Sequence, residues 1–439
     1  MTNKILKQLE DAGFESYAVG GCVRDELLNR VNFDVDITTS ARPDEIKEVF
    51  KDYKIIDIGA KFGTIKVLDE DSEYEITTMR RESGYSDKRH PEKIAFTDDI
   101  KEDLKRRDFT INAMAKRNDQ IIDLFDGKKD LKDKIIRAVG DPNERIKEDV
   151  LRSLRAVRFA TTLNFDISDD LKKAIRNNAE SIEEISKERI QVELNKILLA
   201  DEPRRGILLL DEVRLLEYIF PEVFATKDFD QHSSFHSENL YDHTLSVLEK
   251  TPPILEVRMA ALYHDVGKID TFFLDENGEG RFFGHQSLSE ELLVERLKKL
   301  KYSRKFIENT SILVKRHMDN TNTYTKKSVR KLLRNIGEEN LLNLFKLQRA
   351  DVMSTKHADD SNIDLGLALL DEIKNDDIPT NKSQIKINGN DLKKLGFKEG
   401  KELGRTLENI ENLIYDEKLK NNKEDIINYI NSYLLNVDW

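Results

Sequence analysis

Two aspartates separated by one residue lie in the segment FDVDIT, residues 33–38. If this segment is a strand, Asp34 and Asp36 point to one face while the apolar residues around them point to the other. Two carboxylates about 7 Å apart on one strand face can share hard divalent cations. Such a pair suits phosphoryl transfer, in which metal ions activate an attacking hydroxyl and hold a triphosphate. Taken alone, the pattern is more often an exposed strand edge.

A glycine turn precedes these aspartates in AVGGCVRD, residues 18–25. The run predicts a strand, two glycines and the start of a helix. Gly20 and Gly21 would let the backbone approach a phosphate, and the helix N-terminus adds N–H donors. Arg24 can add a charge-assisted, two-pronged hydrogen bond to the same phosphate. The turn and the aspartates together resemble the signature of the DNA polymerase beta nucleotidyltransferase superfamily.

Three further motifs follow in order: RRDFTINAM (106–114), EDVLRSLRAVRF (148–159) and KERIQVEL (187–194). With the preceding signature, they resemble the motifs of the class II tRNA nucleotidyltransferases and bacterial poly(A) polymerases. The resemblance is firm over residues 15–200 and looser over the rest. It implies template-independent addition of CCA to the 3′ end of tRNA from CTP and ATP, with Mg²⁺ at the active site.

The resemblance also assigns roles to individual residues. Asp34 and Asp36 would be the catalytic, Mg²⁺-binding pair. The residues expected to bind the nucleotide are Gly21, Arg24, Arg107, Asp108, Asn112, Asp149, Arg152, Arg155 and Arg158. Their chemistry agrees at two positions, because Arg107 can fork to a phosphate and the Asp108 carboxylate can accept from a ribose hydroxyl.

Base selection is expected on the helix predicted over EDVLRSLRAVRF. Asp149 and Arg152, three residues apart, would lie together on a face away from the apolar stripe, beside small Ser153 and Ala156. A base could lie on this shelf and pair with the two charged side chains. In the family this motif selects CTP and ATP over UTP and GTP, and C and A both display the exocyclic amine that a carboxylate accepts from. The alternative is an intrahelical Asp149–Arg152 ion pair.

Two neighbouring features have open interpretations. Glu75, in YEITTM, could supply a third carboxylate from an adjacent strand, although a surface glutamate is the commoner case. The polar, highly charged segment 80–103 predicts a flexible loop. In the family such a loop accompanies addition of the terminal A, so its presence favours CCA or A addition over CC alone.

A second set of metal ligands is expected further along the chain. Six residues occur in an order that resembles the HD-superfamily phosphohydrolases: His243, His264, Asp265, His285, His317 and Asp351. The resemblance implies a divalent-metal site, and imidazole with carboxylate suits Mn, Ni, Fe or Co better than Mg. This site could be a second catalytic centre or a degenerate scaffold. The remaining histidines, His90, His232, His236 and His357, fit no pattern and are expected to be structural.

Two kinds of framework are needed to position these motifs. Short β-like runs alternate with turns over the first 140 residues and enclose one helical segment, PDEIKEVFKD. Long helices follow, including amphipathic ones over 204–220 and 238–250. The fold class expected is α+β, a small mixed α/β head followed by an elongated helical neck, body and tail. We assign residues 1–140 to the nucleotidyltransferase head, 141–205 to a base-recognising neck, 206–375 to a body with the HD site, and 376–439 to a tRNA-binding tail.

Composition narrows the class of protein. At 439 residues the chain should form two to four domains, and its net charge of −12 argues weakly against a nonspecific nucleic-acid coat. Lys327, Arg330, Lys331 and Arg334 could meet phosphates from one side of a helix or form a solvated face. A single cysteine, Cys22, and the lack of a long apolar run or signal peptide predict a cytoplasmic protein without membrane contact. No protein partner is implied.

Rival functions remain open. An A-only tRNA nucleotidyltransferase or a poly(A) polymerase would keep the chemistry and change the product. An HD phosphohydrolase with an RNA-binding head would make the paired aspartates dispensable, and the complete D-x-D and RRD motifs argue against it.

Overall fold

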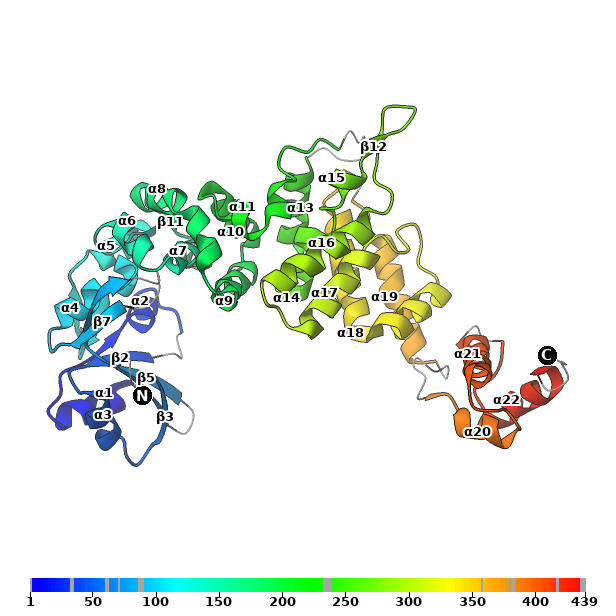
Figure 1. Ribbon diagram of the computed structural model, residues 1–439, viewed down its shortest axis with the longest axis horizontal. Helices are drawn as coiled ribbons and strands as arrows, with labels where there is room; N and C mark the ends of the chain where they lie inside the picture. Colours follow the sequence, from blue (N-terminus) through cyan, green and yellow to red (C-terminus); the bar gives the residue numbers. More distant parts are fainter. Residues whose placement is uncertain are drawn as a thin grey trace. The chain divides into compact units, whose positions relative to one another are not determined.

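The computed structural model describes residues 2–31, 35–59, 63–69, 72–85, 91–231, 239–356, 358–376, 379, 384–415 and 418–434. The chain folds into two compact units, residues 1–224 and 225–439. Figure 1 shows the chain coloured along its sequence. Among the described residues, no helix has the length and apolar character that a membrane span requires. The sheet in the head and the helices that follow confirm the predicted α+β fold class.

A seven-stranded mixed sheet forms the core of the first unit, in the order β3-β4-β5-β2-β1-β8-β9. Its strands are β1 (Ser16–Val19), β2 (Val35–Thr39), β3 (Lys54–Gly59), β4 (Thr64–Asp69), β5 (Ser72–Thr78), β8 (Met114–Arg117) and β9 (Gln120–Asp123). The central strand β2 runs antiparallel to β1 and parallel to β5. The β-like runs of the sequence therefore correspond to real strands.

The register of this sheet places two carboxylates side by side. Asp36 on β2 is paired with Val19 on β1 and with Glu75 on β5. Directly paired residues of neighbouring strands point to the same face. Asp36 and Glu75 therefore lie on the same face of the sheet as Val19, although they are 39 positions apart in the sequence.

Short helices accompany the sheet. They are α1 (Thr2–Asp11), α2 (Gly21–Leu27), α3 (Pro43–Val49), α4 (Ile100–Lys105) and α5 (Gly127–Asp133). The predicted turn at AVGGCVRD is confirmed, because α2 begins directly after Gly20, which has a φ of 74°. Pro43 at the first position of α3 and the Asp99 side chain at the start of α4 fix the starts of these two helices.

The prediction of a flexible loop over residues 80–103 is wrong for most of that segment. Residues Arg80–Tyr85 form β6 and Pro91–Phe96 form β7, an antiparallel pair with Arg80 opposite Phe96; α4 follows. Residues 86–90 lie outside the described part of the chain. The polar sequence did not predict the β6–β7 pair, because the hydrogen bonds between two strands come from the backbone and do not require apolar side chains.

Helices dominate the rest of the first unit. They are α6 (Pro142–Glu148), α7 (Leu151–Leu163), α8 (Asp169–Asn177), α9 (Lys187–Leu198), α10 (Pro203–Glu212), α11 (Leu216–Ile219) and α12 (Pro221–Phe224), with a two-stranded pair of β10 (Ile135–Ile136) and β11 (Asp166–Ile167). The single helix expected over 204–220 is instead split into α10 and α11. Arg214 between them is left-handed, with a φ of 64°, and this ends the helix.

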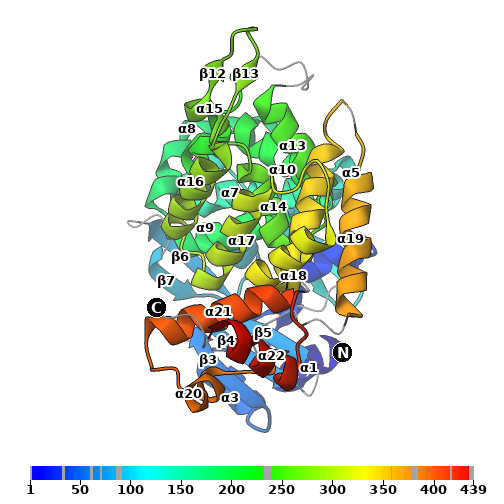
Figure 2. The ribbon, with the colours of Figure 1, turned by 90° about the vertical axis from the view of Figure 1, so that its right-hand side faces the viewer.

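The second unit is a helical body (Figures 1 and 2). Its helices are α13 (Leu240–Lys250), α14 (Leu255–Tyr263), α15 (Lys268–Thr271), α16 (His285–Lys299), α17 (Arg304–Arg316), α18 (Lys326–Val352) and α19 (Ser361–Lys374), and β12 (Phe273–Leu274) pairs with β13 (Gly280–Arg281). The helix predicted over 238–250 corresponds to α13. The predicted turn at DENGEGR joins β12 to β13. Helices α18 and α19 lie side by side in both views.

Helices α20 (Gly389–Lys394), α21 (Lys401–Tyr415) and α22 (Lys423–Tyr429) follow, and a π-helical turn, η5 (Ile430–Leu434), ends the described part of the chain. They share a small apolar core around Leu392, Ile410 and Ile426. Arg330 of α18 is buried and donates to the Tyr415 carbonyl oxygen and to Asp376, while Arg334 lies over the Tyr415 ring. Arg330 is therefore neither on a solvated helix face nor available to a phosphate, so both predicted alternatives are wrong for this residue.

Candidate active site and a second cluster of metal ligands

A cavity of about 500 Å³ opens on the sheet face that carries Asp36. Eight of the residues predicted to bind nucleotide or metal line it: Gly21, Arg24, Asp36, Arg107, Asp108, Asn112, Arg155 and Arg158. Glu75 lines it as well, so it is not an isolated surface glutamate. Asp34, the other predicted catalytic aspartate, lies outside the described residues. The structure thus brings motifs from β1 to α7 into one polar concavity.

The glycine turn allows the closest approach in this cavity. A Cβ atom added at Gly20 would lie 3.0 Å from Nη1 of Arg107 and 3.4 Å from Oδ2 of Asp36. The positive φ of Gly20 already disfavours any other residue. The turn therefore keeps the backbone of α2 open between an exposed carboxylate and an arginine. Cations and an anionic phosphate could meet there.

Asp108 is the most strongly held carboxylate of the cavity. Its Oδ2 atom accepts from Arg155 at 2.6 and 2.8 Å, and its Oδ1 atom accepts from Asn112 at 3.3 Å. Burial alone would raise the pKa of Asp108, but the charge of Arg155 outweighs it and lowers that pKa to about 2. Asp108 is therefore ionised throughout the neutral range, and remains an acceptor.

One aromatic ring organises the arginines. The guanidinium of Arg158 lies 3.8 Å from the ring centroid of Phe159, and those of Arg24 and Arg155 lie at 5.0 and 5.4 Å. Arg24 also donates to the Asn112 side-chain oxygen at 2.7 Å. Contacts with a ring face orient cations while leaving their N–H groups available. Phe159 was not predicted as a site residue, although it closes the EDVLRSLRAVRF motif.

A buried carboxylate, that of Asp103, holds the two arginines of the RRD motif, and the sequence analysis did not identify it. Asp103 is 0% exposed and accepts from Arg106 at 2.8 Å and from Arg107 at 3.3 Å. Burial would raise the pKa of Asp103, but Arg106 and Arg107 lower it overall. Thr38, two residues beyond Asp36 on β2, also donates to it at 3.4 Å. The i, i+3 and i, i+4 spacing in DLKRR was the available signal.

The predicted geometry of base selection is wrong in detail. Asp149 precedes α7 with extended backbone angles, so it does not share a helix face with Arg152. Its Oδ2 atom pairs with Arg189 at 2.7 Å, whereas Arg152 pairs with Glu148 at 2.6 Å. Ser153 and Ala156 are fully buried and leave no open shelf. Neither Asp149 nor Arg152 is among the described residues that line the cavity.

The reason for this error is the position of the helix start. Helix α6 ends at Glu148 and α7 begins at Leu151, so the motif is not one continuous helix. The KERIQVEL segment on α9 supplies the missing partners. Arg189 pairs with Asp149, and buried Glu193 pairs with Arg158 at 2.6 Å. The KERIQVEL motif thus contributes ion-pair partners for the EDVLRSLRAVRF motif, and the sequence did not indicate this pairing.

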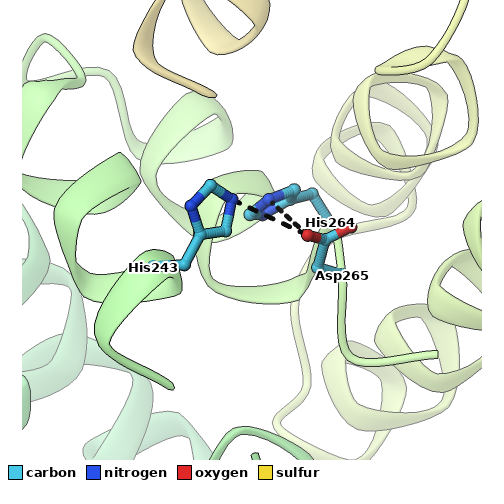
Figure 3. A group of neighbouring side chains, drawn as sticks. All are labelled: His243, His264 and Asp265. Atoms are coloured by element: carbon cyan, nitrogen blue, oxygen red, sulfur yellow. Dashed lines mark ion pairs between the residues drawn. The ribbon is translucent and has the colours of Figure 1, made fainter. Parts of the chain in front are cut away.

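The six predicted HD residues converge within the second unit. Around one oxygen of Asp265 lie Nε2 of His264 at 3.2 Å and Nε2 of His243 at 3.7 Å (Figure 3). Around the other oxygen lie Nε2 of His285 at 3.2 Å and Nε2 of His317 at 3.6 Å. Asp351 lies 3.1 Å from His243. Asp265 therefore belongs to two candidate ligand sets, one on each carboxylate oxygen.

Backbone carbonyls fix the protonation pattern of three of these histidines. Nδ1 of His264, His285 and His317 lies 2.7–2.9 Å from a carbonyl oxygen three residues earlier in the chain. A carbonyl cannot donate, so each Nδ1 must carry the proton. In the neutral ring this leaves the lone pair on Nε2, the atom that points to the cluster. This is the arrangement in which histidine binds a metal ion.

Asp265 lies at the centre of this cluster. It is buried, and Nζ of Lys268 lies 2.6 Å from its Oδ2 atom. Burial would raise the pKa of Asp265, but His264 and Lys268 lower it well below its usual range. Gly267 lets the segment pack closely, because a Cβ there would lie 2.5 Å from the His285 carbonyl oxygen. His232, His236, His90 and His357 lie outside the described residues.

Family models match three stretches of the chain. The Poly A polymerase head domain matches residues 16–137, the "Probable RNA and SrmB-binding site of polymerase A" matches 164–226, and domain 2 of tRNA nucleotidyltransferases matches 282–430. A CCA-adding enzyme of Pediococcus pentosaceus is 36% identical over 429 residues, covering 97% of this chain and 96% of the relative. This chain belongs to the CCA-adding enzyme family.

Further comparisons agree with membership of the CCA-adding enzymes. The CCA-adding enzyme of Lactobacillus helveticus is 36% identical over 97% of this chain and 95% of its own. The crystal structure of the Bacillus stearothermophilus CCA-adding enzyme in complex with CTP superimposes with a TM-score of 0.76 at 27% identity, covering 98% and 95% of the two chains. The Thermotoga maritima CCA-adding enzyme complexed with tRNA shares the fold, with a TM-score of 0.60, 22% identity and coverage of 98% and 94%.

Proposed function

We propose that this protein adds C, C and A to the 3′ end of tRNA, using CTP and ATP and no nucleic-acid template. The observation that carries the proposal is the single cavity in which Asp36, Glu75, Arg107 and Asp108 meet on the head sheet. Family membership supports it, because relatives along the whole chain are CCA-adding enzymes. A carboxylate pair beside arginines is what a reaction between a hydroxyl and a triphosphate requires.

The donor set fits a divalent metal. Asp36 and Glu75 offer hard oxygen ligands on one sheet face, and the Gly20 turn leaves space beside Asp36. We propose Asp34 and Asp36 as the catalytic pair, with Mg²⁺ as the metal and Glu75 as a further ligand or outer partner. When bound, the metal lowers the pKa of the attacking 3′-hydroxyl and neutralises charge on the triphosphate.

The remaining cavity residues hold the nucleotide in this proposal. Arg107, Arg155 and Arg158 bind phosphate oxygens, and Arg24 with the Gly21 amide adds donors at the start of α2. Asp108 and Asn112 accept from and donate to the ribose. Arg155 already pairs with Asp108, and Arg158 with Glu193. An entering triphosphate therefore replaces these carboxylates as the partner of each arginine or shares the arginine with them.

We further propose that Asp149 and Arg152 select the base. A carboxylate accepts from the exocyclic amine of C or A, and a guanidinium donates to a ring nitrogen or carbonyl. Asp149 pairs with Arg189, and Arg152 pairs with Glu148, so an entering base shares or exchanges these partners. Selection by a protein side-chain pair would explain how a base is chosen in the absence of a template.

Incorporation on a truncated tRNA series tests the main proposal. Purified protein is given tRNA lacking its last one, two or three nucleotides, with each NTP separately and then with CTP and ATP together. We expect CTP to be used twice and ATP once, with no use of UTP or GTP. ATP incorporation only on tRNA ending in CC would instead indicate an A-only enzyme, and long A tails would indicate a poly(A) polymerase.

A second activity is proposed for the HD cluster, where a divalent transition metal (Mn, Ni, Fe or Co) would support hydrolysis of a phosphate ester. The converging Nε2 atoms of His264, His285 and His317 favour it, since their tautomers are preset for ligation. Bound metal would supply a nucleophilic hydroxide at neutral pH. The test combines metal content by elemental analysis with metal-dependent hydrolysis of p-nitrophenyl phosphate. Absence of both metal binding and hydrolysis for all four metals would contradict it.

The division of labour along the chain is also a proposal. Residues 1–140 would form the nucleotidyltransferase head, 141–205 the base-recognising neck, 206–375 the body with the HD site, and 376–439 a tRNA-binding tail. We propose the cytoplasm as the location, where tRNA and a lone reduced cysteine are both expected.

A further inference from the structure

Asp103 of α4 is fully buried and is not one of the described residues that line the head cavity. Each of its carboxylate oxygens contacts a different part of the head. Oδ1 accepts from Nε and Nη2 of Arg106 at 3.0 and 2.8 Å, and from the backbone N–H of Arg80, where β6 begins, at 3.4 Å. Oδ2 accepts from Nη2 of Arg107 at 3.3 Å. One side chain thus joins the β6–β7 ribbon to an arginine of the cavity.

The Arg107 guanidinium lines the head cavity and has one anchored side and one side that faces the glycine turn. Among the described residues, no atom accepts a hydrogen bond from its buried Nε. Nη2 donates to Asp103, whereas Nη1 lies 3.0 Å from the point where a Cβ on Gly20 would stand. Oδ2 of Asp36 lies 3.4 Å from the same point. The bond to Asp103 therefore determines which nitrogen of Arg107 is directed toward Asp36.

The strand that carries Asp36 also contacts this carboxylate. Thr38 and Asp36 are two residues apart on β2, so their side chains lie on one face of the sheet. The Thr38 hydroxyl lies 3.4 Å from Oδ2 of Asp103 and 3.3 Å from the Thr77 carbonyl oxygen. A hydroxyl has one proton to donate, and two acceptors share it here, so the charged Arg107 is the stronger partner of Oδ2. Asp103 thus holds Arg107 at a fixed place relative to β2.

We propose that Asp103 is a positioning residue for nucleotide transfer, which holds Arg107 so that Nη1 meets the triphosphate beside Asp36. This inference rests on the transfer reaction proposed for the head. Asp103 touches no substrate and acts through Arg107. Once the anchor loses its charge, the guanidinium is free to turn and pair with Asp36 in place of a phosphate. A displacement of about 1 Å in a positioned group costs on the order of 100-fold in rate.

A double-mutant cycle tests this role. Asp103→Asn keeps the size of the side chain and removes its charge, so we expect kcat/KM for CTP, on tRNA that lacks its last three nucleotides, to fall about 100-fold. Arg107→Ala alone should cost about as much or more. In the Arg107→Ala background, Asp103→Asn should change kcat/KM by less than about twofold, because the arginine through which it acts is gone. A further large loss there would overturn the inference and assign Asp103 to support of the fold.

Two further variants separate positioning from helix stability. Asp99→Ala removes the side chain that accepts from the Lys101 N–H and caps α4, so it weakens the same helix without touching Arg107. It should leave kcat/KM unchanged. Asp103→Glu keeps the charge but displaces it, so it should cost about tenfold, and it replaces Asp103→Asn in the cycle if the latter does not fold. Equal losses for the Asn and Glu variants would indicate packing alone and would overturn the inference.

Equilibrium binding without tRNA gives a second measurement. Because Arg107 meets phosphate and not the base, Asp103→Asn should raise the Kd of CTP about tenfold and leave that of cytidine unchanged. Equal changes for both ligands, or none, would overturn the inference. A parent protein that incorporates no nucleotide on any truncated tRNA would instead reject the proposed function. Full activity of Asp103→Asn in an active parent would reject the positioning role alone.

Discussion

The cavity of the head and the HD cluster of the body both concentrate charge, but they satisfy it in opposite ways. In the head, described arginines that line the cavity already pair with anions: Arg155 with Asp108, and Arg158 with Glu193. In the body, four imidazoles surround shared carboxylates, and backbone carbonyls hold three of them with Nε2 directed inward. The first pattern suits a ligand that enters and leaves, because the empty site is held in shape by internal ion pairs. The second suits a resident cation.

The largest expected effect separates the two regions outright. Asp36→Ala removes a proposed metal ligand, so nucleotide incorporation on tRNA should fall by about 1,000-fold or more. Hydrolysis of p-nitrophenyl phosphate should not change. Asp57→Ala, a change of an exposed aspartate on β3 of the same sheet, serves as the control and should leave both activities intact. If incorporation survived Asp36→Ala, the head cavity would not be the polymerising site.

The reciprocal change addresses the body. His264→Ala should abolish metal binding by the proposed HD site and the phosphohydrolase activity proposed for it, while incorporation of CTP and ATP stays within about twofold of the parent protein. Asp270→Ala, at an exposed position six residues further on, should retain bound metal. Loss of incorporation in a folded His264→Ala protein would mean that the two regions do not act independently.

A smaller effect probes the ion pairs that shape the head. Arg189→Ala removes the partner of Asp149, whose carboxylate then rotates more freely. The ratio of kcat/KM for CTP over UTP should fall about tenfold, within the range for one lost base contact. Lys196→Ala, at an exposed position near the end of α9, should leave the ratio unchanged. An equal loss for CTP and UTP would show that Arg189 supports the fold and not base selection.

The smallest effect concerns acid stability. Asp108 has a pKa of about 2 in the folded protein against an ordinary 3.8, so the unfolded state binds the proton more tightly. Its contribution, about 2 kcal/mol, is full above pH 4 and is lost as the pH falls toward 2. Asp108→Asn should therefore lower the free energy of unfolding at pH 7 and flatten its dependence below pH 4. Urea titrations at several pH values measure this, with the exposed Asp119→Asn as control.

Patterns within single segments were predictable from the sequence. Alternation in FDVDIT and YEITTM gave correct strands, and the glycine turn before α2 was correct as well. The order of the six HD residues also indicated that they would converge. The strand and turn signals depend on local spacing. The HD set was instead predicted from the resemblance of its residue order to a known superfamily.

Partners from distant segments were not predictable. Arg189 and Glu193 act by pairing with residues of another motif, and nothing local marks a charged residue as a member of such a pair. The error at Asp149 has the same origin. The motif lacked a clear break signal, yet α6 ends and a new helix begins within it because the two helices pack on different neighbours. Tertiary packing overrode the periodicity.

The anchoring of the last helices affects how a deletion should be interpreted. Arg330 is 4% exposed, and it bonds to the Tyr415 carbonyl oxygen from the same helix, α18, whose far end supplies Asp351. Shortening the protein before α21 would strip a buried guanidinium of an acceptor, and a lost partner for a buried charge is costly. Weak tRNA binding by such a shortened protein would therefore report a damaged helical body as readily as a missing RNA contact. Point changes on the outer face of α21 avoid this ambiguity.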